Sequence, residues 1–244
     1  MTVQNLMAAI TVGFISIALA NGSAMAQATT SQPVKAEPTG KDKDGHKHDE
    51  KKESKKDDKK ADSKSASTAK IGEAAPDFKL TDTEGKEISL AALTKSGKIV
   101  VIEWYNPECP YIVKHHKTHT TFNDLHAKYA AKGVEFIAIN SGAKGKQGYG
   151  KELNTEMKAK FKLPYPVLLD ENGEVGRSYG AKNTPQVYIV TKDGKLAYNG
   201  AIDDDRSVDT LGKTNYVSKA LDEILANTSV STPETKPYGC GVKY

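Results

Sequence analysis

Hydrophobic and polar positions follow two different patterns along this chain of 244 residues. The first 70 residues hold one apolar run and then a long polar tract, whereas short apolar runs alternate with amphipathic stretches from residue 71 onward. The apolar and alternating runs predict strands at 75–80, 87–89, 99–104, 134–140, 165–169, 186–190 and 196–199. Helical periodicity and capping residues predict helices at 90–95, 110–132, 151–161, 175–179 and 215–227. This order predicts an α/β domain in which helices cover both faces of a central mixed β-sheet, with an N-terminal β-hairpin.

The longest predicted helix, 110–132, directly follows the apolar strand 99–104 and ends at Gly133. One face of that helix collects six side chains, namely Tyr111, His115, Thr118, Phe122, Leu125 and Tyr129. His116 falls outside this face and is expected to face solvent. Further along, Asp193-Gly194 between two apolar runs predicts a hairpin that adds antiparallel strands at one edge of the sheet.

The first 26 residues have the pattern of a cleavable signal peptide. The apolar stretch 7–20 is too short to span a bilayer comfortably, so no stable membrane span is expected. Ala24-Met25-Ala26 matches an A-x-A cleavage pattern. We therefore expect export to the periplasm or the outside of the cell, where the compartment is oxidising.

Composition separates the remaining chain into three parts. Residues 27–70 are rich in Lys, Asp and Glu with almost nothing to bury, which predicts a disordered linker. A folded domain is expected at 71–230, and a C-terminal tail at 231–244 carries Cys240. Lys and Arg number 35 against 31 Asp and Glu, a net charge of +4 without a purely basic patch, so nucleic-acid binding is not expected.

The chain has two cysteines, which excludes a disulfide-dense scaffold and allows one redox pair. Cys109 follows the strand 99–104 after a sharp turn, and Pro110 then opens a helix. Proline suits the first helical position, which leaves Cys109 at or next to the N-cap. Free amides and the helix dipole favour the thiolate there, so Cys109 is a candidate nucleophile rather than a small buried hydrophobic residue.

Three segments resemble the redoxin branch of the thioredoxin superfamily (alkyl hydroperoxide reductase/thiol-specific antioxidant-like). APDFKLTDTEGKEISL is similar to the opening hairpin of that branch, WYNPECPY to its active-site turn and TPQVYIV to its cis-proline segment. NPECPYIVKHH with a terminal KPYGCGVKY resembles exported peroxiredoxin-like proteins. The resemblance implies a thioredoxin-like fold and thiol–disulfide exchange or peroxiredoxin-like antioxidant activity without a cofactor. The implied partners are a thiol- or disulfide-bearing protein or a small peroxide, and an external reductant protein.

The sequence departs from both parent motifs. In Cys109-Pro110-Tyr111-Ile112 the second cysteine of the thioredoxin C-x-x-C motif is missing. The peroxiredoxin P-x-x-x-T/S-x-x-C signature is also missing, because Asn106 stands at its Thr/Ser position and Ile102 at its Pro position. Dithiol exchange would therefore need a second thiol from elsewhere.

Cys240 is the remaining candidate for a resolving cysteine. About a dozen residues separate it from the last predicted helix, and at ~3.3 Å per extended residue they reach back to Cys109. The neighbouring glycines would allow close backbone approach. The alternative is a disordered tail with a free thiol.

The resemblance also implies supporting roles for five residues. Glu103 stands where thioredoxins keep a buried acid that exchanges protons with the active-site thiol; alternatively it points outwards or pairs with a lysine. Pro185 is expected in the cis form facing Cys109, with Thr184 contacting the substrate. Trp104 and Tyr111 are expected to frame an apolar rim.

Two other classes of function remain open. His115 and His119 have the i,i+4 spacing that allows two imidazoles to bind one metal ion, and the cysteines would complete a copper or zinc site. His115 alternatively is a buried structural histidine. The third hypothesis is a thioredoxin-like binding module without catalysis, which the missing second turn cysteine favours.

Overall fold

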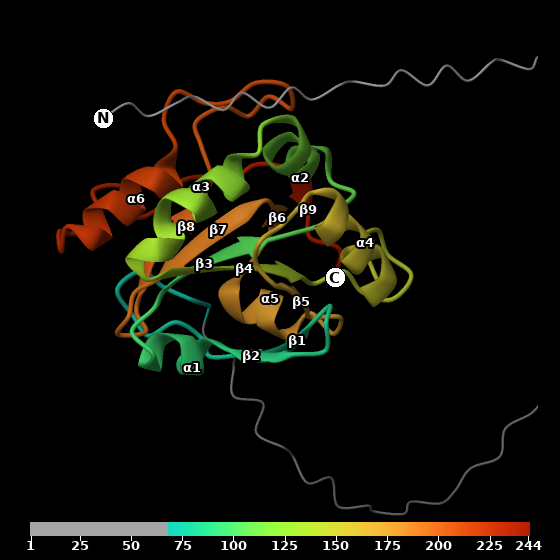
Figure 1. Cartoon of the computed structure of the whole chain (residues 1–244), viewed down its shortest axis with the longest axis horizontal. Coiled ribbons are helices and arrows are strands. Elements are labelled where there is room, and N and C mark those ends of the chain that lie inside the picture. The colour runs from blue at the N-terminus through green and yellow to red at the C-terminus, as the bar shows by residue number, and fades with distance from the viewer. Residues whose placement is uncertain (1–67) are drawn as a thin grey trace, which may run out of the picture. The chain divides into compact units, whose positions relative to one another are not determined.

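The computed structural model describes residues 68–244, and the predicted signal peptide and most of the predicted linker lie outside this range. Within the described range a seven-stranded sheet has the order β2-β1-β5-β4-β3-β7-β8 (Figure 1). Its strands are β1 (Lys79–Asp82), β2 (Glu87–Ser89), β3 (Ile99–Trp104), β4 (Val134–Asn140), β5 (Val167–Leu169), β7 (Gln186–Val190) and β8 (Leu196–Gly200). The central pairs β3–β4 and β4–β5 are parallel, and the remaining pairs are antiparallel. Antiparallel strands therefore close both edges of the sheet, where the sequence predicted one.

The central strands are hydrophobic on both faces because helices cover both. The helices are α1 (Leu90–Lys95), α2 (Pro110–Val113), α3 (Thr121–Tyr129), α4 (Lys151–Lys160), α5 (Glu174–Tyr179) and α6 (Tyr216–Leu225). Side chains of α2, α3 and α6 form one hydrophobic core with Val101 and Phe136, while α1 and α5 pack on the opposite face against Val100 and Ile102 (Figure 1). All six residues of β3 are buried, which explains its nearly uninterrupted apolar sequence.

The predicted α/β class, central mixed sheet and opening hairpin are confirmed. The prediction of one continuous helix over 110–132 is wrong. A π-helical turn, η1 (Lys114–Thr118), follows α2, the chain breaks at Thr120 with a φ of 48°, and α3 then runs to a 3-10 turn, η2 (Ala130–Lys132). Three successive side chains, Lys114, His115 and His116, are buried in the π turn. In a regular helix three successive side chains point in directions that span more than half of the circumference, so all three are rarely buried together. Here the turn is widened and the protein packs against it from two sides, which buries all three.

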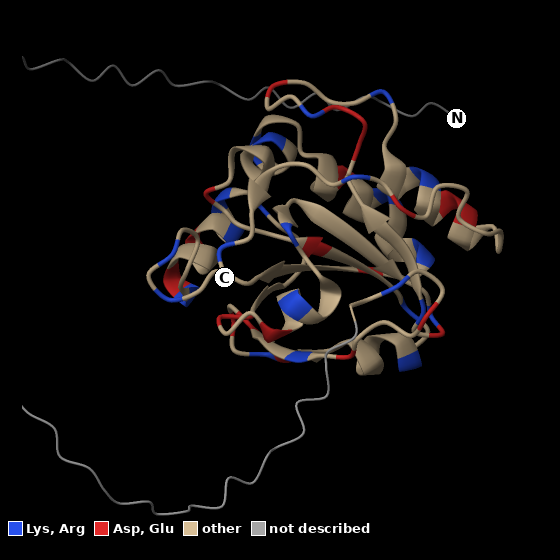
Figure 2. Ribbon diagram, turned by 180° about the vertical axis from the view of Figure 1, so that it is seen from behind, with Lys and Arg blue, Asp and Glu red and all other residues tan. Residues whose placement is uncertain are grey.

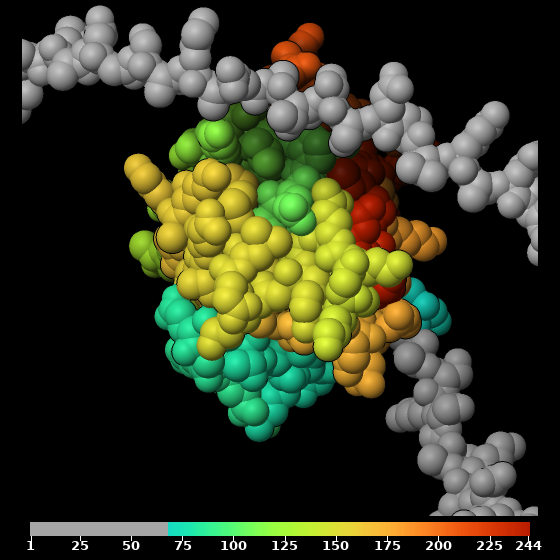
Figure 3. All heavy atoms as spheres, turned by 90° about the vertical axis from the view of Figure 1, so that its right-hand side faces the viewer, coloured from blue at the N-terminus to red at the C-terminus, as the bar shows by residue number. Residues whose placement is uncertain are grey.

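The C-terminal tail is part of the folded structure. It runs beside β8, where Asn199 N donates to Pro233 O at 3.0 Å and Tyr198 shares a hydrogen bond with Thr235 at 2.7 Å. It then forms β9 (Cys240–Gly241), which pairs antiparallel with β6 (Asn183–Thr184). Figure 3 shows this red segment next to the yellow loop that follows β4, joined by Ala143 N donating to Lys243 O at 2.8 Å. The tail therefore returns to the carboxyl end of β3, where the cysteine turn begins.

Charged residues are interspersed around the domain, with Lys and Arg segments alternating with Asp and Glu segments in Figure 2. None of the helices in residues 68–244 has the length and apolar content needed to cross a membrane.

Candidate active site

Cys109 is the N-cap residue of α2, with extended backbone angles (φ −78°, ψ 127°) and Pro110 at the first helical position. The turn before it is held by Asn106, whose Oδ1 accepts from Glu108 N at 3.0 Å and whose backbone carbonyl accepts from Cys109 N at 3.0 Å. The predicted strand–turn–cysteine–helix arrangement is thus present. Cys109 itself is 0 % exposed in this conformation.

The peptide bond between Thr184 and Pro185 is cis, as the sequence resemblance implies. Thr184 ends β6, and its carbonyl oxygen lies 3.0 Å from Cys109 Sγ, so the thiol donates to it. Segments 75 residues apart in sequence therefore meet at this contact.

Cys240 lies in the strand that pairs with this backbone segment. In the antiparallel pair β6–β9, Thr184 is opposite Cys240 and Asn183 is opposite Gly241. Two further hydrogen bonds hold the strand, Val242 N to Lys182 O at 3.0 Å and Asn183 Nδ2 to Gly239 O at 3.2 Å. Both cysteines are free thiols. The predicted proximity of Cys240 to Cys109 is therefore present in the reduced protein, without a disulfide bond.

The two thiols interact. Burial, a hydrogen bond with Cys109 and the negative charge of Cys109 raise the pKa of Cys240 to about 12, against a small opposing effect of Lys243. Cys240 consequently stays protonated at neutral pH while the two sulfur atoms are reduced and adjacent.

Glu103 projects from β3 into the same core as Cys109 and is 1 % exposed. Its Oε1 accepts from His116 Nε2 at 2.7 Å, and its Oε2 is 3.4 Å from the hydroxyl of Tyr165. Glu103 therefore neither points outwards nor pairs with a lysine, and both alternatives are wrong. The expected solvent exposure of His116 is also wrong, because its ring stacks on Phe122 at 4.9 Å and on Phe161 at 5.7 Å between centroids. A single straight helix could not bring Phe122 over His116, whereas the break at residues 119–120 does.

Tyr238 belongs to the site, although no sequence pattern predicted it. It is buried, its ring lies 5.7 Å from that of Tyr111, and its hydroxyl donates to Asp203. His115 Nε2 lies 2.9 Å from the Tyr238 oxygen and donates to it, which leaves His115 Nδ1 to accept from Thr121 at 3.2 Å. The sequence signal was a tyrosine directly before the Gly-Cys-Gly segment. That signal does not predict the pocket around the ring, because the pocket residues lie far from Tyr238 in the sequence.

Burial, supported by the charges of Lys114, His116 and His119, lowers the pKa of His115 to about 3. His115 is thus a neutral structural histidine with both ring nitrogens in use. His119 Nε2 contacts Asp209 O at 2.8 Å. Residues 68–244 contain no group of three or more His, Cys, Asp and Glu side chains placed to hold a metal ion. The structure gives the metal hypothesis no support from His115.

The expected position of Trp104 requires a correction. Trp104 is 0 % exposed and lies in the core on the opposite face of the sheet from Cys109, where its Nε1 donates to Ser141 Oγ at 3.1 Å. Side chains alternate along β3, so Trp104 and Glu103 point to opposite faces. Tyr111, in contrast, is half-buried against Tyr238 and does lie beside the site.

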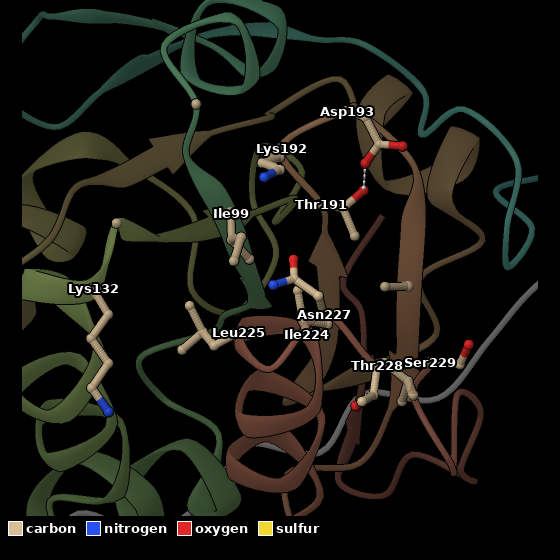
Figure 4. Close-up of a pocket in the computed structure, with 14 residues that line it drawn as sticks. Ile99, Lys132, Thr191, Lys192, Asp193, Ile224, Leu225, Asn227, Thr228 and Ser229 are labelled. Carbon is tan, nitrogen blue, oxygen red and sulfur yellow. Dashed lines mark hydrogen bonds between the residues drawn. The ribbon is translucent and has the colours of Figure 1, made fainter.

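A cavity of about 510 Å³ lies at the other end of β3, lined by Ile99, Lys132, Lys192 and residues 224–225 and 227–230 (Figure 4). Ile99 and Trp104 are the two ends of the strand, so this cavity is separate from the Cys109 site.

The fold is thioredoxin-like, and a cysteine at a helix start facing a cis-proline defines a thiol-redox class of site. The sequence profile of the Redoxin family matches residues 70–216, and the chain belongs to this family. A thiol-disulfide oxidoreductase ResA of Bacillus thuringiensis subsp. konkukian is 32 % identical over 130 residues, which are 52 % of this chain and 67 % of the relative. A chloroplastic peroxiredoxin Q of Suaeda salsa is 29 % identical over 156 residues, or 58 % of this chain and 66 % of the relative.

A hypothetical protein from Sinorhizobium meliloti 1021 has a similar crystal structure, with a TM-score of 0.65 and 25 % identity over 72 % of this chain and 96 % of its own. The family match and the ResA and peroxiredoxin Q relatives support a redox function. Cys240 lies beyond the region that the family profile matches, so the tail is a feature to be explained from this chain itself.

Proposed function

We propose that this protein is a thiol–disulfide oxidoreductase in which Cys109 attacks the substrate disulfide and Cys240 resolves the mixed disulfide. The observation that carries the proposal is the meeting of both free thiols at Thr184, which bonds Cys109 Sγ through its carbonyl and pairs with Cys240 through its strand. Neither a structural cysteine nor a binding module requires a second thiol at that place.

The proposed reaction has two exchange steps. The Cys109 thiolate attacks one sulfur of a substrate disulfide, a Cys109–substrate disulfide forms, and the first substrate sulfur leaves as a thiolate. Cys240 then attacks Cys109 Sγ, which releases the second substrate thiolate and leaves a Cys109–Cys240 disulfide. Two electrons pass from the protein to the substrate, and an external dithiol reductant protein restores both thiols. The same steps in reverse oxidise a dithiol substrate.

The weak acidity of the Cys240 thiol supports this order. Cys240, with a pKa raised to about 12, stays a thiol and is a poor nucleophile in the resting state. Once Cys109 is held in a mixed disulfide it carries no negative charge and no longer interacts as a thiolate with Cys240. Two of the causes that raise the pKa of Cys240 are then gone, so its thiolate becomes more accessible when resolution is required.

We assign to Glu103 the exchange of protons with the Cys109 thiol. Glu103 lies on the same face of β3 as Val101, and this is the side of the sheet on which Tyr105 and Cys109 are buried. His116 holds the carboxylate in place at 2.7 Å. A carboxyl group that is buried on the same side of the sheet as a thiol is a candidate for general acid–base work.

Thiol-dependent reduction of a small peroxide is the less favoured activity. Asn106 stands at the position of the peroxiredoxin Thr/Ser, and its side chain is already engaged by Glu108 N at 3.0 Å and Gln147 O at 3.5 Å. It is therefore poorly placed to polarise an O–O bond. We further propose export through the N-terminal 26 residues, which N-terminal sequencing of the protein from separated cell fractions tests.

The proposal is tested by intact mass and differential alkylation of the full chain with and without reductant, followed by peptide mapping. The oxidised protein should lose the two thiol labels together and yield a Cys109–Cys240 peptide. Turnover of a model protein disulfide should require Cys109. Labelling of both thiols after treatment with an oxidised dithiol would contradict the resolving role of Cys240. Bound copper or zinc that blocks labelling would instead support the metal hypothesis.

A further inference from the structure

The tail pairs with the backbone segment that precedes the cis-proline, directly beside the reactive thiol. Within the described residues β6 pairs with β9 alone, and this pairing places Cys240 at Cys109. We propose that residues 238–241 act as an internal peptide ligand, and that the protein partner of the site presents an aromatic residue, a glycine and then its redox-active cysteine in an extended strand. This inference rests on the proposed function, because it names the class of substrate that Cys109 would attack.

The aromatic position is defined by the pocket around Tyr238. The ring packs against Tyr111, and Lys114 Nζ lies 5.3 Å from the ring centroid. The hydroxyl bonds to His115 at 2.9 Å and to Asp203. All four pocket residues belong to the main domain, so the pocket is available to another chain when the tail leaves. Its polar floor favours tyrosine among aromatic side chains.

The position next to the cysteine requires glycine. Gly239 has a φ of 117°, a region that side chains rarely adopt, and a Cβ there would collide with the carbonyl group of Thr184. The tail strand lies close to Thr184 because β9 pairs with β6, which contains Thr184. A partner that pairs with β6 in the same register meets the same obstacle.

The position after the cysteine is permissive. A Cβ on Gly241 would have no atom of the described residues within 4 Å. The expected recognition pattern is therefore aromatic–glycine–cysteine–any residue. Backbone hydrogen bonds to β6 would supply the part of the affinity that does not depend on the partner's side chains.

Tail and partner cannot occupy β6 together. Cys109 is 0 % exposed while the tail is docked, so a substrate reaches its sulfur only after residues 238–241 have left. The local concentration of the tail makes it a competitor for every substrate, and a partner displaces it by filling the same pocket.

The test measures how fast Cys109 reacts with peptide disulfides, in the full chain carrying Cys240→Ser to prevent resolution. The probes are the peptide Lys-Pro-Tyr-Gly-Cys-Gly-Val joined through its cysteine to thionitrobenzoate, and three versions with alanine for tyrosine, for the first glycine or for the second glycine. Cysteine joined to thionitrobenzoate is the probe without a peptide. In each case Cys109 displaces the coloured thionitrobenzoate anion and forms a disulfide with the peptide.

We expect alanine for tyrosine and alanine for the first glycine each to slow the reaction about tenfold, as is typical when an anchor residue is lost from a buried pocket. Alanine for the second glycine should leave the rate within about twofold, because that position carries no anchor. In the Tyr238→Ala, Cys240→Ser chain the parent peptide should react faster, because its competitor has lost its anchor.

Equal rates for all four peptides, while the cysteine probe also reacts, would overturn the proposed recognition and leave the proposed function standing. Failure of Cys109 to react with any probe, including the small one, would overturn the proposed function and the recognition with it. An unchanged rate in the Tyr238→Ala chain would contradict competition by the tail.

Discussion

Glu103 Oε1 and His116 Nε2 lie 2.7 Å apart, and both side chains are almost completely withdrawn from solvent. Two adjacent structural features produce this pair, a carboxylate inside an apolar strand and a widened helical turn that directs His116 inward. A buried carboxylate without a partner would strongly destabilise the fold. The hydrogen bond from the His116 imidazole therefore allows Glu103 to remain in the core.

Glu103→Gln should lower the rate of disulfide exchange at neutral pH by about tenfold or more, because an amide cannot exchange a proton with the Cys109 thiol. The side chain keeps its size and its bond with His116. The measurement is the second-order rate of Cys109 with a small disulfide between pH 5 and 9. Glu135→Gln is the matched control, a half-buried glutamate on the neighbouring strand. Identical pH profiles for the wild-type and Glu103→Gln proteins would refute the assigned role.

Replacing the two cysteines by serine should have different effects. Cys109→Ser should form no mixed disulfide and lose activity, since the attacking sulfur is gone. Cys240→Ser should accumulate the Cys109–substrate disulfide, since the resolving sulfur is gone. Non-reducing electrophoresis and mass spectrometry of substrate complexes distinguish the two results. Accumulation of complexes on Cys240 instead would reverse the proposed roles.

Gly239→Ala should release the tail strand. The new Cβ would collide with the Thr184 carbonyl at a φ of 117°, and Cys240 would lose the burial and the contact with Cys109 that together raise its pKa to about 12. Cys240 should then be alkylated at least about tenfold faster at mildly alkaline pH, because more of it is thiolate. Gly241→Ala is the control, because its Cβ would meet no atom of the described residues within 4 Å. Equal alkylation of Cys240 in the two variants would show that the strand contact does not protect it.

His115 should make the protein sensitive to acid. Its pKa, lowered from 6.5 to about 3 mainly by burial, means that the unfolded chain binds the proton more readily than the folded one. The resulting stability is complete above pH 6.5 and is lost as the pH falls towards 3. Over this interval one such group changes the free energy of unfolding by at most about 1.4 kcal/mol per pH unit.

Denaturant unfolding of the wild-type protein and of His115→Gln between pH 7 and 4 measures this slope. Glutamine can hydrogen-bond to both Thr121 and Tyr238 but does not titrate, so the variant should show the shallower dependence. Parallel curves would mean that other groups cause the acid sensitivity.

The sequence by itself determined the central strands and the position of Cys109 at a helix start, whereas β1 (Lys79–Asp82) lies later than the predicted 75–80 and the short strands β6 and β9 were not predicted. Ile99–Trp104 and Val134–Asn140 are strands because β-branched apolar runs of this length are stable only when buried on both faces. Asp193-Gly194 specified a hairpin through local turn chemistry, and Pro110 fixed Cys109 at a helix start. These are short-range effects, which neighbouring residues decide.

Only the tertiary structure decided which groups surround Cys109. Trp104 and Glu103 are adjacent in sequence and equally buried, and the packing of helices on each face determined that Glu103 shares the core of Cys109. His116 is buried because the helix breaks and returns Phe122 and Phe161 over it. Cys240 reaches Cys109 because Tyr238 fills a pocket made by two distant parts of the chain, residues 111–115 and Asp203. Such contacts join residues far apart in sequence, and they form only when the whole domain folds. They therefore leave no local pattern from which the sequence could predict them.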